Sequence, residues 1–329
     1  METSPRIGVT GAAGFIGGHA IEAVFRAGMR PVAIVRPGSD PSRLGGRNLE
    51  IREADLLDAA ALTRAFDGLA GVIHLAALTR AKSESEFLAA NADGVARAVA
   101  ALEAASPRAR FVYVSSLAAA GPSSAGQPVA ESDVARPVTP YGRSKLAGES
   151  SLRSSSQTGQ WTIVRPPIVY GPGERDLLEM FRMARRGVVP VTGPRGARYS
   201  IIHAEDLARG AVMALVSQKS LGKTYFLAEP SDYTWEEIAR VIGSAVGRQP
   251  WCPRIPTPIA WGVAALGSIA KPFMARPPLV TLDKIPEIVA AGWTCSVEQA
   301  RRDLGFETQI QFAAGAQATA DWYRSKAWL

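Results

Sequence analysis

Short apolar runs alternate with alanine-rich amphipathic stretches along the first half of the chain. The apolar runs predict strands at 6–10, 31–35, 49–52, 71–75, 111–115 and 161–165. Helices are predicted between them, from a glycine loop to residue 28, over 58–66 and 84–105, and from 141 onward. Strand, helix and strand at this spacing predict a parallel, doubly wound α/β sheet, whose strands are apolar because both faces are buried.

The regular alternation ends near Gly171, and prolines then gather at 250–258 and 272–278. A chain of 329 residues also exceeds the ~100–200 residues typical of one domain. We therefore expect two parts. Residues 1–170 with about 199–228 would form the sheet domain, and 171–198 with about 229–329 a smaller, mixed C-terminal lobe over the carboxyl edge of the sheet.

Composition places the chain among ordinary globular proteins, with 47% hydrophobic and 20% charged residues. The net charge of +7 comes from scattered basic residues, and no nucleic-acid-binding signature is present, so we expect phosphorylated small ligands and no nucleic acid. The two cysteines lack metal-ligand spacing, which fits free thiols. With no signal-peptide pattern and no uninterrupted apolar run of about 20 residues, we expect a cytoplasmic protein.

A glycine loop lies between the first predicted strand and the first predicted helix. Gly11, Gly14 and Gly17 allow a tight turn and a close approach of the backbone to a pyrophosphate, while Phe15 and Ile16 open the helix. The free N–H groups and positive dipole end of that helix favour phosphate. A simple glycine turn is the alternative, but the position inside a strand–helix–strand unit predicts a dinucleotide site.

Two residues bear on which dinucleotide is bound. Arg36 closes the second strand, where an NAD site usually places Asp or Glu for the ribose hydroxyls. A guanidinium there can bind a 2′-phosphate, so we expect NADP, with NAD as second choice; a solvated surface Arg is the alternative. Asp55, after the third strand, is expected either to accept a hydrogen bond from adenine or to serve as a turn residue.

An acid–base pair is predicted at the helix that follows Thr139–Pro140, an N-cap and first helical position. Tyr141 and Lys145 are four residues apart and share a helix face. A neighbouring ammonium should lower the pKa of the phenol from about 10, so that it can exchange a proton with a substrate oxygen. Ser115 and Ser116 end the fifth strand, where a hydroxyl could hold that oxygen or be an ordinary serine.

Taken together, these stretches resemble the extended short-chain dehydrogenase/reductase family, also called the epimerase/dehydratase family. The matching stretches run in the family's order along nearly the whole chain: TGAAGFIGG, ADLLD, VIHLAA, NADGV, VYVSSLAAAG, PYGRSK, VRPPIVYGPG and IIHAEDLARG. The resemblance implies a Rossmann-type NAD(P)-binding domain with a smaller C-terminal substrate lobe.

The resemblance also implies residue roles. Tyr141 would be the acid–base, Lys145 would bind the nicotinamide ribose and lower the Tyr pKa, and Ser116 would be the family's catalytic Ser/Thr. Asn91 would support the cofactor side of the fold. Further cofactor contacts would come from Leu56, Leu75, Ala76, Ala77, Ser115, Pro166 and Ile168.

One departure from the family bears on the substrate. Members that act on nucleotide sugars usually carry Asn three residues after the Arg that ends the sixth strand, and Ile168 stands there. This part and Arg36 look more like the branch of 3β-hydroxysteroid dehydrogenases and dihydroflavonol reductases. The apolar stretch 255–270 could line an apolar pocket or be only a buried helix. Arg195 and Arg198 keep a sugar-nucleotide phosphate as an alternative.

Our hypothesis is therefore an NAD(P)(H)-dependent oxidoreductase that interconverts a secondary alcohol and a ketone on a largely apolar, sterol-like substrate. The alternatives are a nucleotide-sugar epimerase or dehydratase that retains its cofactor, and a non-catalytic cofactor-binding sensor. We also expect a homodimer. A further hypothesis is peripheral contact with the inner face of a membrane through residues 255–276, with Lys271 and Arg276 at the headgroups.

Overall fold

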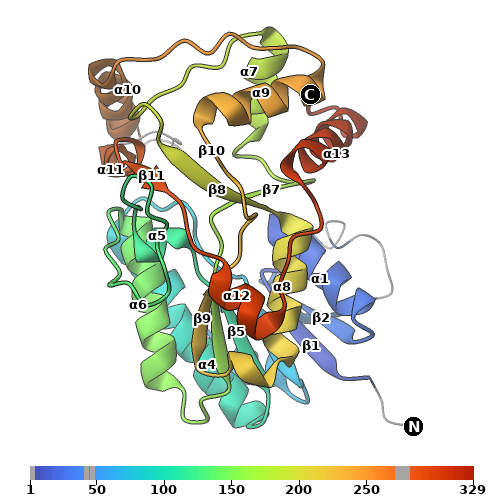
Figure 1. Cartoon of the computed structure of the whole chain (residues 1–329). Helices are drawn as coiled ribbons and strands as arrows, with labels where there is room; N and C mark the ends of the chain where they lie inside the picture. Colours follow the sequence, from blue (N-terminus) through green and yellow to red (C-terminus); the bar gives the residue numbers. More distant parts are fainter. Residues whose placement is uncertain (1–3, 41–43, 45–48, 271–281) are drawn as a thin grey trace.

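The computed structural model describes residues 4–40, 44, 49–270 and 282–329. Its main sheet has seven strands in the order β3-β2-β1-β4-β5-β6-β9, all paired in parallel (Figure 1). Six of them confirm the predicted strands to within one residue. The strands are β1 (Arg6–Thr10), β2 (Arg30–Val35), β3 (Glu50–Glu53), β4 (Gly71–His74), β5 (Arg110–Val114), β6 (Trp161–Arg165) and β9 (Lys223–Phe226).

The strand order reverses between β1 and β4, which is where ligands bind in open α/β sheets, beyond the carboxyl ends of the strands. Helices cover both faces, and each face has its own apolar core. One face carries α1 (Phe15–Arg26) and α8 (Ala204–Val216). The other carries α2 (Ala59–Phe66), α4 (Gly94–Ala105) and α6 (Pro140–Ser155).

Of two helix predictions, one is confirmed and the other is wrong in part. Asp58 caps α2 by accepting a hydrogen bond of 2.9 Å from the N–H of Ala61, as expected. The single helix expected over 84–105 is interrupted instead. It consists of α3 (Glu84–Leu88), a π-helical turn η2 (Ala89–Asp93) and α4. Such π turns often mark functional sites, and this one contains a predicted site residue, Asn91.

A second, smaller sheet lies at the end of the main sheet where β5 leads into α5 (Leu117–Ala120) (Figure 1). Its central strand is β8 (Arg198–His203), which pairs in parallel with β7 (Ile168–Tyr170) and β11 (Gly292–Trp293) and antiparallel with β10 (Asp232–Tyr233). The sequence boundaries grouped β7 and β8 with the first domain, yet both pair in this second sheet.

The helices of the smaller lobe surround a separate apolar core. The larger ones around this core are α7 (Leu178–Arg186), α9 (Trp235–Val246) and α13 (Phe312–Ser325), while α10 (Thr257–Ala270) instead contacts η5 and α11. Shorter elements of this lobe are η5 (Leu282–Lys284) and α11 (Ile285–Ile288), whereas η3 (Gln218–Ser220) and α12 (Glu298–Leu304) lie beside β9, and Ala300 of α12 belongs to a core of the main sheet.

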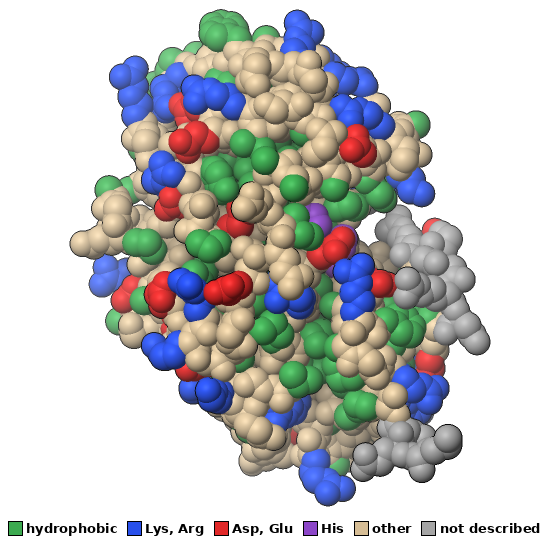
Figure 2. All heavy atoms as spheres, turned by 45° about the vertical axis from the view of Figure 1, so that its right-hand side comes forward, with side chains coloured by type: hydrophobic (Ala, Val, Ile, Leu, Met, Phe, Trp, Pro, Cys, Tyr) green, Lys and Arg blue, Asp and Glu red, His purple; other side chains and the backbone are tan. Residues whose placement is uncertain are grey.

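Positive and negative side chains are mixed on the surface, and helix α10 exposes apolar side chains. Figure 2 shows Lys and Arg side chains interspersed with Asp and Glu over the face in view. Helix α10 has no charged residue and exposes Ile259, Trp261 and Leu266. Among the described residues, no helix has both the length and the apolar character needed to cross a membrane. The membrane contact expected through 255–276 stays a prediction, and its part from 271 onward lies outside the described residues.

Candidate active site

The glycine loop forms the turn that the sequence predicts. The N–H of Gly14 donates to the carbonyl of Gly11 at 2.8 Å, and Gly11 has a φ of +66°. A Cβ on Gly17 would lie 2.4 Å from the carbonyl oxygens of Gly11 and Ala12. Helix α1 then begins at Phe15 with no side-chain cap, so its first N–H groups lack side-chain partners. This cradle fits a dinucleotide pyrophosphate.

The two residues expected near the adenosine end lie beyond β2 and β3. Arg36 directly follows β2 and is exposed; its carbonyl accepts from the N–H of Ser39 at 3.1 Å, but within the described part of the chain its side chain forms no hydrogen bond or ion pair. Its guanidinium is therefore accessible to a ligand. Asp55 accepts a 2.8 Å hydrogen bond from the N–H of Leu57, so one carboxylate oxygen serves a turn. Leu56 lies against Gly94, where a Cβ would be 3.2 Å from its side chain.

Thr10, at the end of β1, orders the loop after β4, a role that the sequence analysis missed. Its hydroxyl accepts from the N–H groups of Leu75 and Ala76 at 3.1 and 3.2 Å and lies 3.0 Å from Nδ1 of His74. Burial lowers the pKa of His74 to about 3, so this imidazole is neutral. The loop carrying Ala76 consequently lies beside Gly11, with Ala77 exposed next to it.

Asn91 is fully buried in the π-helical turn and connects two predicted site segments. Its Oδ1 accepts from the N–H of Leu78 at 2.8 Å, while its Nδ2 donates to the Leu78 carbonyl and to Ser144 Oγ, both at 2.9 Å. Ser144 lies on α6 between Tyr141 and Lys145. Asn91 thus ties the loop after β4 to the helix that carries the predicted acid–base pair.

The structure brings the three predicted catalytic side chains together. Thr139 caps α6 by accepting from the N–H of Gly142 at 3.1 Å, so the helix begins where the sequence predicts. Ser116 caps α5 and hydrogen-bonds the phenol of Tyr141. One helical turn further along α6, Lys145 Nζ donates to the carbonyl of Val114 at 2.8 Å, at the end of β5. Strand β5 and helix α6 together position all three.

The electrostatics of this group differ from the expectation that Lys145 lowers the pKa of Tyr141. Burial raises the pKa of Tyr141 to about 12, although the hydrogen bond from Ser116 opposes the shift and Glu287 adds to it. Burial also lowers the pKa of Lys145 to about 7, with Glu149 opposing. The expected direction is wrong because burial is the largest influence on both groups, and Lys145 is not among the influences on the pKa of Tyr141. The phenol is protonated at neutral pH.

A buried carboxylate beneath the site was not predicted. Glu149 Oε1 accepts from Ser115 Oγ at 2.7 Å and from Arg165 Nε at 2.8 Å, and its Oε2 accepts from Arg165 Nη2 at 2.6 Å. The hydroxyl of Ser115 is therefore engaged with Glu149 and does not join Ser116 at Tyr141. The sequence carried a signal for this network, since Glu149 follows Lys145 by four residues and shares its helix face.

The remaining predicted residues lie at the junction with the second sheet. The carbonyl of Pro166 accepts from the N–H of Leu117 at 2.8 Å, and Ile168 begins β7 in register with Ile201. Arg198 is neutralised by Asp232, with Nε to Oδ1 at 2.6 Å, which weakens the phosphate-binding alternative. Arg195 is exposed.

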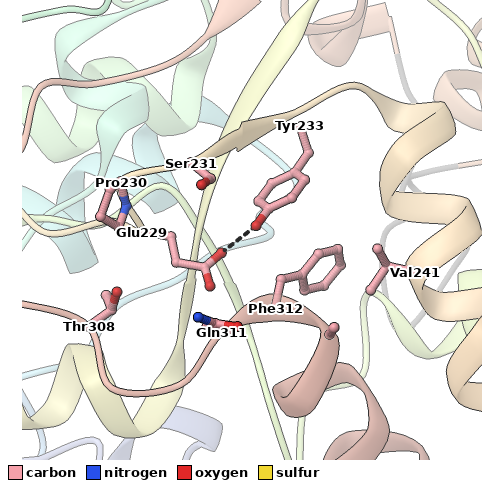
Figure 3. Close-up of a pocket in the computed structure, with 9 residues that line it drawn as sticks. Glu229, Pro230, Ser231, Tyr233, Val241, Thr308, Gln311 and Phe312 are labelled. Atoms are coloured by element: carbon pink, nitrogen blue, oxygen red, sulfur yellow. Dashed lines mark hydrogen bonds between the residues drawn. The ribbon is translucent and has the colours of Figure 1, made fainter.

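A pocket of about 470 Å³ lies elsewhere in the smaller lobe, and Figure 3 shows its lining. Tyr233 donates to Glu229 at 3.1 Å, and burial raises the pKa of Glu229 to about 7. None of its lining residues is a predicted site residue, so it is separate from the Tyr141 group. They are Glu229, Pro230, Ser231, Tyr233, Val241, Thr308, Gln311, Phe312 and Ala313.

Comparison with known proteins places this geometry in a family. The model of the NAD dependent epimerase/dehydratase family matches residues 7–228. A ceramide reductase of Caulobacter vibrioides is 34% identical, over 100% of this chain and 98% of its own length. A 3 beta-hydroxysteroid dehydrogenase/Delta 5-->4-isomerase of Mycobacterium tuberculosis is 27% identical, over 92% of this chain and 86% of its own.

A solved structure agrees at the level of the fold. The crystal structure of gox2253 covers 99% of this chain and 100% of its own, with a TM-score of 0.82 and 23% sequence identity. The family resemblance expected from the motifs is thereby confirmed. The chain belongs to the NAD dependent epimerase/dehydratase family, as an NAD(P)-dependent dehydrogenase/reductase of the extended short-chain type.

Proposed function

We propose that the enzyme reduces a ketone on a long-chain or polycyclic, largely apolar substrate to a secondary alcohol, with NADPH as the reductant. The observation that carries the proposal is the grouping of Tyr141, Ser116 and Lys145 at the carboxyl end of β5, and the state of Tyr141 supports the direction. Its phenol is protonated at neutral pH because burial raises its pKa to about 12. A protonated phenol is ready to give a proton to the oxygen of a ketone, whereas oxidation of an alcohol would need the phenolate.

The proposed roles follow from the hydrogen bonds. Ser116 holds the phenol of Tyr141 and would share the substrate oxygen with it. Lys145, anchored on the Val114 carbonyl, would bind the nicotinamide ribose in its ammonium form. NADPH, when bound, supplies the hydride for the carbonyl carbon. Tyr141 gives its proton to the carbonyl oxygen, and its phenolate is stabilised by Ser116 until it regains a proton.

The preference for NADP(H) rests on Arg36. The guanidinium lies at the end of β2, is exposed, and has no acidic partner within the described residues. A 2′-phosphate offers it a bidentate, charge-assisted contact that the ribose hydroxyls of NAD lack.

The substrate class rests on three observations. Ile168 occupies the position where nucleotide-sugar enzymes usually carry Asn, and Arg198 is already paired with Asp232. Helix α10 gives the smaller lobe a continuous apolar segment. The two relatives are named for a ceramide and a 3β-hydroxysteroid, both largely apolar molecules.

A substrate panel tests this function. The enzyme is mixed with NADPH and, in turn, a long-chain aliphatic ketone, a ketosteroid, UDP-glucose and dTDP-glucose, and the absorbance of reduced cofactor is followed. We expect the absorbance to fall only with the apolar ketones. Conversion of a nucleotide sugar with no net change in that absorbance, and no response to either ketone, would establish the epimerase alternative instead.

A further inference from the structure

A charged pair from the smaller lobe lies beside the catalytic phenol. Lys284, the last residue of η5, places its Nζ 6.0 Å from the ring centroid of Tyr141. The same Nζ is 2.9 Å from Oε2 of Glu287 on α11. Neither residue was singled out by the sequence, because more than 140 residues separate them from Tyr141 along the chain.

The pair is accessible and adds little to the fold. Each side chain is 36% exposed, and a surface pair of this kind contributes about 0–1 kcal/mol to stability. The backbone here is held by other contacts: Ile285 is buried, and the carbonyl of Glu287 accepts a 2.9 Å hydrogen bond from Nε1 of Trp293. The two charged ends, although paired with each other, are therefore exposed enough for a ligand to reach them.

The surroundings of the pair set the kind of ligand. The ring of Tyr141 also contacts Phe87, at 6.0 Å between centroids, so an apolar wall adjoins the phenol. The N–H of Leu282 donates to Ser268 Oγ at 2.8 Å, which joins η5 to the apolar helix α10. Arg143 on α6 and Glu84 on α3 form another charged pair, at 2.6 Å, and Asp283 also interacts with Arg143. The phenol of Tyr141 thus has both an aromatic neighbour, Phe87, and an exposed charged pair close to it.

We propose that Lys284 and Glu287 form the polar end of the substrate site and bind an amide or hydroxyl group on the carbon next to the reacting carbonyl. This inference rests on the proposed ketone reduction. An ammonium beside a carboxylate matches a neutral group that both accepts and donates hydrogen bonds. An anionic head group such as a phosphate would be attracted by Lys284 but repelled by the carboxylate of Glu287. The proposed substrate is therefore a long-chain ketone that carries an uncharged polar group on the carbon next to its carbonyl.

The test uses two ketones of equal chain length, one with an acetamido group on the carbon next to the carbonyl and one without it. We expect the parent enzyme with NADPH to favour the acetamido ketone in kcat/KM. Lys284→Met should lower kcat/KM for that ketone about 10- to 100-fold, mainly through KM, as expected for loss of a charge-assisted hydrogen bond. The plain ketone should change by less than about threefold, since it never made this contact. Glu287→Gln should give a smaller selective loss for the acetamido ketone, beside a shift of the pH profile that both ketones share, because Glu287 raises the pKa of Tyr141.

A matched control is Lys223→Met, which breaks the 2.9 Å pair with Asp303 on the sheet domain and should leave both ketones unaffected. Equal losses for the two ketones in Lys284→Met, or a loss confined to kcat, would overturn the inference and leave ketone reduction standing. Failure of the parent to reduce either ketone would instead overturn the proposed function, and this inference with it.

Discussion

Replacing Glu149 by Gln removes the carboxylate to which Arg165 and Ser115 are bound. Arg165 and Glu149 have side chains that are only 6% and 0% exposed, and two hydrogen bonds of 2.8 and 2.6 Å join them. Breaking a buried pair on one side typically costs about 3–5 kcal/mol, because the remaining charge is left uncompensated. The carboxylate of Glu131 also interacts with Arg165, so we expect the lower end, about 3 kcal/mol.

Urea unfolding followed by circular dichroism measures this loss in the free energy of unfolding. Arg153→Gln is the matched control, since it breaks a longer contact to the same carboxylate, at 3.4 Å, from a side chain that is 40% exposed. That variant should lose less than about 1 kcal/mol. A loss below about 1 kcal/mol in Glu149→Gln as well would refute the reasoning that the buried pair holds the end of β6 to α6.

The same variant should change the pH dependence of the enzyme. Glu149 raises the pKa of Lys145, which burial lowers to about 7. If the ammonium form binds the cofactor, kcat/KM for NADPH is highest below pH 7 and falls as pH rises through the pKa of Lys145. Without Glu149 the pKa is lower still, so the fall should occur at lower pH. An unchanged midpoint would contradict this role for Lys145.

Three further predictions concern the cofactor and the second pocket. Gly17→Ala places a Cβ 2.4 Å from two loop carbonyls and should weaken NADPH binding at least about tenfold by calorimetry, while Gly18→Ala, with open space around its Cβ, should not. Arg36→Asp should remove about 1.5–3 kcal/mol of binding free energy for NADPH and little for NADH; equal affinity of the parent for both would contradict the assignment. Burial raises the pKa of Glu229 to about 7, so the folded state holds a proton more firmly and stability should fall as pH rises from about 4.5 through 7. Glu229→Gln should remove that part of the pH dependence of Tm.

The first domain was largely predictable because its signals are local. Five of its first six strands are short, mostly apolar runs, β3 (EIRE) being the exception, and the glycine loop and the α6 cap lie within a few residues of the elements they define. The π-helical turn at Asn91 was not predictable, because the one extra residue in such a turn hardly changes the helical spacing of the apolar residues.

The smaller lobe was less predictable because its sheet is assembled from distant segments. Strands as short as β10 and β11, each of two residues, carry no periodicity of their own and form only by pairing with β8. For the same reason no local pattern indicated that Lys284 lies beside Tyr141. The pKa of Tyr141 was misjudged because helix spacing reports proximity to Lys145 but not the burial that both residues share.

The central claim is that Tyr141 gives the proton that accompanies hydride transfer. Tyr141→Phe removes only the phenolic oxygen, and the measurement is the single-turnover rate of NADPH oxidation by an apolar ketone, beside the calorimetric affinity for NADPH. We predict a fall in rate of about 10²–10⁴ with the cofactor affinity essentially unchanged. A variant that reduces the ketone within a few-fold of the parent rate would contradict the account.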